Sequence, residues 1–234
     1  MKLVWLLCAT LALGLGGCAK FPDNPIGAGG KRLVFKLTVQ GKLRTGQGAG
    51  QTGLPYVYII ALNLSNDDNP TTQGPIPIVV PGGNGMVAGD ATHFILWDPL
   101  ASPQYKIFKF RDSTLAEWFQ IGIPVNYVPT AEGDRTMQFE IDLSQLVPVL
   151  DVPNLKSVQV NYLTMNNTNT SGSGRIWDAL GDANIPTQVN APFTFRLNAS
   201  RVFNNLNQGN IEPVGDSLDP DLDLSDWEVE VRIQ

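Results

Sequence analysis

The chain has 234 residues, with 22 acidic against 16 basic ones and a net charge of −6 when its single histidine is neutral. An acidic chain without a basic cluster does not favour nucleic acid or electrostatic binding to anionic lipid, so we expect no nucleic-acid partner. His93 has no second histidine and no nearby cysteine with which to form a zinc site.

The first 18 residues have the pattern of an export signal that ends at a cysteine. Lys2 supplies the positive start, residues 3–15 are apolar, and Gly16 and Gly17 are small residues directly before Cys18. The apolar run is shorter than the roughly 20 residues that span a bilayer. The alternative is an ordinary signal peptide with an incidental cysteine.

The Leu15-Gly16-Gly17-Cys18 ending resembles the signal of bacterial lipoproteins, and only these first residues carry that resemblance. It implies that residues 1–17 are removed and that Cys18 is diacylated on sulfur and then acylated on its new amino terminus. Because Cys8 leaves with the signal, the mature chain would hold no thiol for a disulfide, a thiolate metal site or nucleophilic catalysis. Ala19, where inner-membrane lipoproteins commonly have aspartate, implies anchoring in the cell envelope at the outer membrane.

Residues 18–30 are rich in glycine and proline and predict a flexible tether, followed by one domain over residues 31–234. Four later stretches alternate apolar and polar residues, the period of a strand with one face on a core. They are residues 33–40, 137–143, 193–198 and 227–233. Residues 56–64 are apolar at nearly every position and predict a central strand covered on both faces.

Further apolar runs predict strands at residues 76–80, 93–97, 105–111, 119–128 and 158–165. Single helical turns are expected at residues 114–117, 143–150 and 177–180, all too short to form a layer. Many short strands separated by Asn-, Asp-, Gly- and Pro-rich turns predict an all-β fold, an antiparallel β-sandwich of immunoglobulin-like or jelly-roll-like type.

Catalytic motifs are scarce in this sequence. A Ser-His-Asp triad would have to use His93, and there is no Gly-x-Ser-x-Gly elbow. A glycosidase needs only two carboxylates across a cleft, and 22 acidic residues allow many pairs. We therefore predict no catalytic residues, and keep a carboxylate-based glycosidase as the least favoured alternative.

The acidic segment near the C-terminal end has a spacing that could suit a metal. Asp219, Asp221, Asp223 and Asp226 could converge their oxygens on a hard cation, which makes calcium the one candidate cofactor of a chain that is otherwise expected to have none. The segment lacks the glycine and the distal glutamate of an EF-hand loop. The interpretation that the sequence favours is a solvated acidic edge strand, in which charges discourage edge-to-edge pairing.

Two tryptophans near loops, Trp118 and Trp177, are candidate ligand-binding residues, since exposed rings beside polar loops often hold sugar faces. Trp97 and Trp227 lie at the ends of alternating strands and are expected in the core. The chain is similar to carbohydrate-binding sandwiches of the type 9 and DOMON-like kind in the order of its elements. That order is an alternating strand that ends at residues 139–144, a second strand, a polar loop and residues 177–181. That resemblance implies a glycan-binding sandwich and assigns no site residue.

The sequence thus favours a lipid-anchored, non-catalytic envelope protein that binds a protein partner or serves in assembly. A surface glycan-binding module is the alternative.

Overall fold

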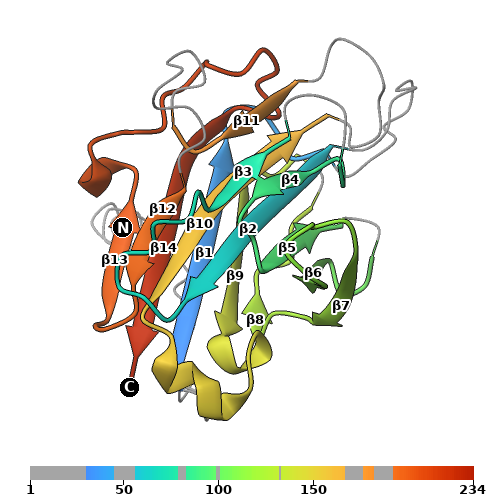
Figure 1. Ribbon diagram of the computed structural model, residues 1–234. Coiled ribbons are helices and arrows are strands. Elements are labelled where there is room, and N and C mark those ends of the chain that lie inside the picture. The colour runs from blue at the N-terminus through green and yellow to red at the C-terminus, as the bar shows by residue number, and fades with distance from the viewer. Residues whose placement is uncertain are drawn as a thin grey trace, which may run out of the picture.

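Two antiparallel sheets packed face to face form the computed structural model, which confirms the predicted all-β sandwich (Figure 1). The structure describes residues 30–44, 56–78, 83–98, 101–131, 133–166, 176–181 and 192–234. Cys18, the expected signal and residues 18–29 of the expected tether lie outside these residues.

The first sheet has five strands and contains both the first and the last strand of the chain. Its order is β13 (Arg201–Asn204), β14 (Leu224–Ile233), β1 (Lys31–Val39), β9 (Thr136–Asp142) and β8 (Asn126–Tyr127). In β1 the alternation places Leu33, Phe35 and Leu37 on the core face, where each is 0% exposed.

The second sheet is larger. It runs in the order β11 (Trp177–Ala179), β10 (Ser157–Met165), β2 (Val57–Ser65), β5 (His93–Trp97), β6 (Tyr105–Phe110) and β7 (Trp118–Gly122). A further strand, β12 (Phe193–Arg196), pairs with the other half of the β10 edge that β11 uses. A hairpin of β3 (Pro75–Pro77) and β4 (Val87–Gly89) and the 3-10 helices η1 (Leu143–Gln145), η2 (Val149–Asn154) and η3 (Leu206–Gln208) complete the elements.

The larger sheet is covered on both faces, which explains why β2 is apolar throughout. Ile60 and Leu62 belong to the core shared with the first sheet. Ile59 and Ala61 face a second apolar cluster that includes Val87 of β4. The prediction of a central strand here is confirmed, because β2 lies between β10 and β5 and is almost entirely buried.

Three local predictions differ from the structure. The single strand expected over residues 119–128 is two strands in different sheets, β7 and β8, with Pro124 between them; proline has no N–H for a sheet ladder. Residues 177–180, expected to form a helical turn, contain strand β11, because pairing with β10 satisfies their backbone. Residues 114–117 form no helix, and Leu115 has a left-handed φ of 55°.

Two other predictions are partly met. Two short helices lie where a turn was expected over residues 143–150. Strand β3 covers only the start of the run at 76–80, whose Val79 and Val80 lie outside the described residues.

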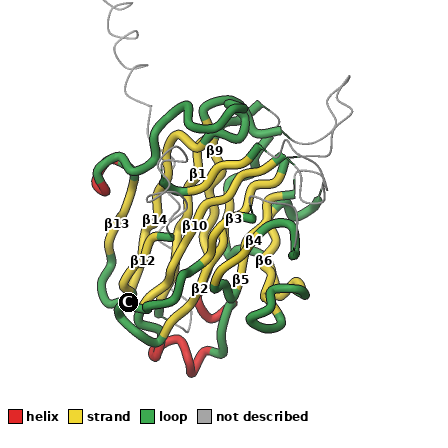
Figure 2. The backbone as a smooth tube through the Cα atoms, turned by 45° about the horizontal axis from the view of Figure 1, so that its top comes forward, coloured by secondary structure: helices red, strands yellow, loops and turns green. Residues whose placement is uncertain are grey.

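The sandwich has two distinct ends. One end carries Lys31, the C-terminal strand end and η2, and the Lys31 Nζ atom donates to the Leu155 carbonyl oxygen at 2.6 Å. The opposite end carries Val39 and the start of β14, together with the segment before it (Figures 1 and 2). Within the part of the chain that the structure describes, no helix has the length and apolar character needed to cross a membrane.

Candidate functional site

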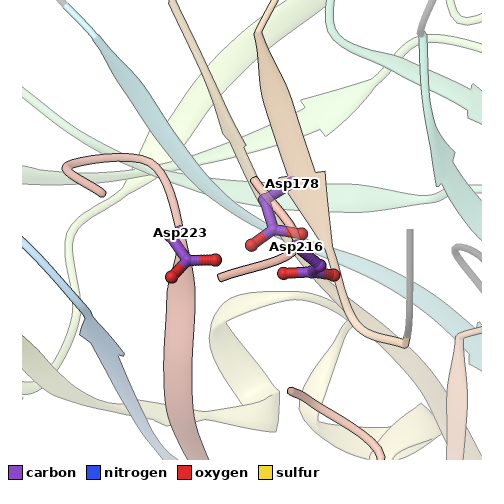
Figure 3. A group of neighbouring side chains, drawn as sticks. All are labelled: Asp178, Asp216 and Asp223. Atoms are coloured by element: carbon purple, nitrogen blue, oxygen red, sulfur yellow. The ribbon is translucent and has the colours of Figure 1, made fainter. Parts of the chain in front are cut away.

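Three aspartates from separate parts of the chain meet at the Val39 end of the sandwich (Figure 3). Asp178 lies in β11, Asp223 directly precedes β14, and Asp216 lies in the segment that leads to β14. One carboxylate oxygen from each lies within 4.8 Å of the others. Asp178 and Asp223 are 0% exposed, whereas Asp216 is half-buried.

Backbone N–H groups orient the two fully buried aspartates. Asp178 accepts hydrogen bonds from Ala179 N at 2.8 Å and from Leu224 N at 2.7 Å, one on each oxygen. Asp223 accepts from Gly215 N at 2.8 Å and from Ser217 N at 3.2 Å. The carboxylates are therefore fixed in place by the folded backbone.

Glu212 is a fourth carboxylate beside this group and is 2% exposed. Its Oε2 atom accepts from Gly181 N at 3.0 Å, and its backbone is held by the Asn205 amide through bonds of 2.8 and 2.9 Å. Among the described residues, its Oε1 atom is buried without a hydrogen-bond partner. A buried polar oxygen in that state costs free energy unless something binds it.

Electrostatics at this cluster disfavour the presence of so many negative charges. Burial, and then repulsion from Asp216, raises the pKa of Asp178 well above the usual carboxyl range. The pKa of Glu212 is also raised well above that range, mainly by burial and to a smaller extent by repulsion from Asp178. Within the described ranges, no lysine or arginine forms an ion pair with Asp178, Glu212 or Asp223. Protons or a bound cation must balance these charges, and all the donors are oxygens, which hard cations prefer.

The four aspartates that the sequence offered as a candidate calcium set do not gather in one group. Asp221 forms an ion pair with Arg44 and accepts from Lys42 N at 2.8 Å. Asp219 accepts from the Tyr56 hydroxyl, and burial followed by this bond raises the pKa of Tyr56 to about 12. Asp226 lies 3.9 Å from Lys36 Nζ on the outer face. Only Asp223 joins the buried cluster.

Sequence reasoning missed Asp178, Glu212 and Asp216 as members of one site. Asp178 stands in a short apolar stretch, Trp177 to Leu180, and an acid inside such a stretch is the one local signal that could have marked it. No local spacing links it to Asp223, which lies 45 positions later.

Trp118 and Trp177, the candidate ligand-binding rings, lie in different places. Trp118 is 38% exposed on the edge strand β7, and its ring packs edge-on to Phe94 and Phe110 at centroid distances of 6.1 and 6.4 Å. Trp177 is half-buried against the second apolar cluster, next to Asp178. Phe110, whose ring packs on Trp118, also lines a cavity of about 290 Å³ together with the polar residues Asn63, Lys109 and Asp112, whereas Trp118 is not among the lining residues.

No protein-family model matches this chain, and no curated protein or solved structure matches it.

Proposed function

We propose that the protein is a lipid-anchored, non-catalytic component of a bacterial cell envelope, in which the sandwich serves as a binding or assembly module. The Leu15-Gly16-Gly17-Cys18 sequence carries this proposal. Each buried acyl methylene contributes about 0.8 kcal/mol, and two or more chains give stable anchoring.

The spacing between Cys18 and the first strand supports the same proposal. Residues 19–30 separate the cysteine from Lys31, where β1 begins. Fully extended, this segment reaches at most about 45 Å. The anchor would hold the sandwich near the membrane surface while leaving it room to meet a partner.

Fractionation of cells that express the full chain tests the anchor. Cys18→Ser should move the protein from the membrane fraction to the soluble fraction and abolish fatty-acid labelling. Cys8→Ser is the matched control, because Cys8 is removed with the signal, and it should leave both results unchanged. A Cys18→Ser protein that stays in the membrane pellet with its label would refute the proposal.

A glycan-binding role is the second candidate, and the polar cavity lined by Phe110, whose ring packs on the partly exposed Trp118, favours it. An aromatic face next to amide, carboxylate and ammonium groups is a common way to hold a sugar ring. Screening on a glycan array should then give a ligand whose binding is lost in Trp118→Ala. Phe119→Ala, which removes a neighbouring ring on the other face of β7, should leave binding unchanged. An array without ligands would exclude this role.

A further inference from the structure

We propose that Asp178, Glu212, Asp216 and Asp223 bind one calcium ion at the Val39 end of the sandwich. This site does not depend on the anchor, and it differs from the acidic run that the sequence suggested. It ties β11 and β14, which belong to different sheets, to the segment at residues 212–216.

The geometry of the three aspartates fits a single ion. Calcium lies about 2.3–2.6 Å from its oxygen ligands, so two ligands on opposite sides of the ion are up to about 5 Å apart. The ligand oxygens of Asp178, Asp216 and Asp223 lie within 4.8 Å of one another, inside that limit. Figure 3 shows the three carboxylates gathered around one space.

Glu212 supplies an independent reason for a ligand at this place. Its Oε2 is held by Gly181 N, three residues after Asp178, and its buried Oε1 has no hydrogen-bond partner among the described residues. Such a group is costly unless a proton donor or a cation meets it. An ion between the aspartates and Glu212 provides that partner.

The cluster is also built before any ion arrives. Backbone N–H groups hold Asp178 and Asp223. Both Asp178 oxygens and the Oδ2 atom of Asp223 accept one such bond each, which leaves each of these three oxygens a second lone pair for a cation. Asp216 is half-buried, which gives an ion a path from solvent.

The donor set selects calcium over other common ions. All four side chains offer oxygen, whereas zinc prefers nitrogen and sulfur. Magnesium keeps several waters and requires near-ideal octahedral geometry, which a buried cluster of four carboxylates does not offer. Calcium accepts variable numbers of carboxylate ligands and is the best match.

Titration of the full chain in detergent, after removal of metals with EDTA, tests the proposal. Calorimetry should show one calcium ion per chain with a dissociation constant of about 10⁻³ M or lower, and magnesium should bind at least about tenfold more weakly. Terbium should bind in place of calcium and emit when Trp177, the neighbour of Asp178, is excited. Added calcium should quench that emission.

Variants locate the ion. Glu212→Gln keeps an oxygen for Gly181 N, and Asp216→Asn changes a half-buried side chain; each should weaken calcium binding at least about tenfold. Asp226→Asn is the matched control, because it removes the same charge from an aspartate in β14 whose side chain is 46% exposed and lies beside Lys36, and it should change affinity less than about twofold.

Two results would overturn the proposal. One is the absence of saturable calcium and terbium binding by the unaltered chain, a measurement that needs no variant to fold. The other is unchanged affinity in Asp216→Asn, or a loss in Asp226→Asn as large as in Asp216→Asn, which would place the ion on the acidic run instead.

Discussion

Asp219, Asp221 and Asp223 alternate along one short segment, and each carboxylate meets a different part of the molecule. Asp219 meets Tyr56, Asp221 meets Arg44, and Asp223 turns into the buried cluster. The partners of the first two lie 163 and 177 positions away in sequence. Spacing alone predicts which residues share a face, but it does not identify the groups on the opposite side of the fold.

The buried histidine gives a prediction about pH at the scale of one residue. His93 is 2% exposed, and burial, with a smaller effect from Lys109, lowers its pKa to about 4. In the unfolded chain the pKa of the His93 imidazole is near 6.5, so the unfolded chain takes up the proton more readily than the folded one. The contribution of neutral His93 to the free energy of unfolding is therefore fully present above a pH of about 6.5. It falls by about 3 kcal/mol in total as the pH drops from there to below 4.

Urea unfolding of the unaltered chain and His93→Gln at several pH values measures this effect. The stability difference between the two proteins should shrink by about 2 kcal/mol from pH 7 to about pH 4.5. Comparing the two proteins cancels the carboxyl groups that titrate in the same range. Parallel curves would contradict the prediction.

Gly41 gives a second prediction, because the chain leaves β1 there against residues 220–221. Its N–H donates to the Pro220 carbonyl oxygen at 2.5 Å, and a Cβ atom would lie 2.7 Å from that carbonyl carbon and oxygen. Gly41→Ala should lower the free energy of unfolding by about 1–3 kcal/mol. Gly122→Ala is the control, because a Cβ atom at Gly122 would have its nearest neighbour 4.0 Å away. This variant should leave the free energy of unfolding unchanged or raise it by up to about 1 kcal/mol. Equal thermal midpoints for both variants would rule out the close approach.

Whole strands were predicted most reliably where one face is buried. The period of two located β1, β9, β12 and β14, because each has a core face and a polar face. The break at Pro124 was missed because residues on both sides are apolar, and the sheet that a strand joins depends on partners elsewhere in the chain. Strand β11 has only three residues, too few to show a period, and this hid Asp178 as well.

Aromatic rings in these strands should carry a large part of the stability. Phe139 in β9 is 1% exposed and packs on Phe35, and Phe195 in β12 is 0% exposed and packs near Trp227. Phe139→Ala and Phe195→Ala should each lower the free energy of unfolding by about 3–5 kcal/mol. Phe119→Ala, at a ring that is 50% exposed, should cost less than about 1 kcal/mol. Denaturant unfolding, monitored by circular dichroism, measures all three variants. Small decreases in the free energy of unfolding for both Phe139→Ala and Phe195→Ala would refute the strand register that buries these two rings.

At the scale of the whole molecule, the two ends of the sandwich differ in what they carry. An anchor at Cys18 would attach to the sandwich at its Lys31 end, near η2, whereas the carboxylate cluster lies at the Val39 end. Nine residues of β1 separate these ends by about 30 Å. An anchored molecule would therefore present the cluster away from the bilayer.

Site-specific labelling can measure that orientation. Leu150 in η2 is 88% exposed and Leu218 beside Asp219 is 90% exposed, which makes them a matched pair at opposite ends. A dye on Leu150→Cys should be quenched more strongly by headgroup-labelled lipid than a dye on Leu218→Cys. Equal quenching would mean that the tether lets the sandwich turn freely.

The position of β1 between β14 and β9 has a consequence for biosynthesis. Lys31 pairs with Ile233, so the middle of the five-stranded sheet brings together the first and last described strands. Contacts over such long sequence separations close large loops and form slowly. The sheet cannot be completed until β14 (Leu224–Ile233) has been synthesised. A nascent chain that stays unfolded until then is in the state that threading through a narrow export channel requires.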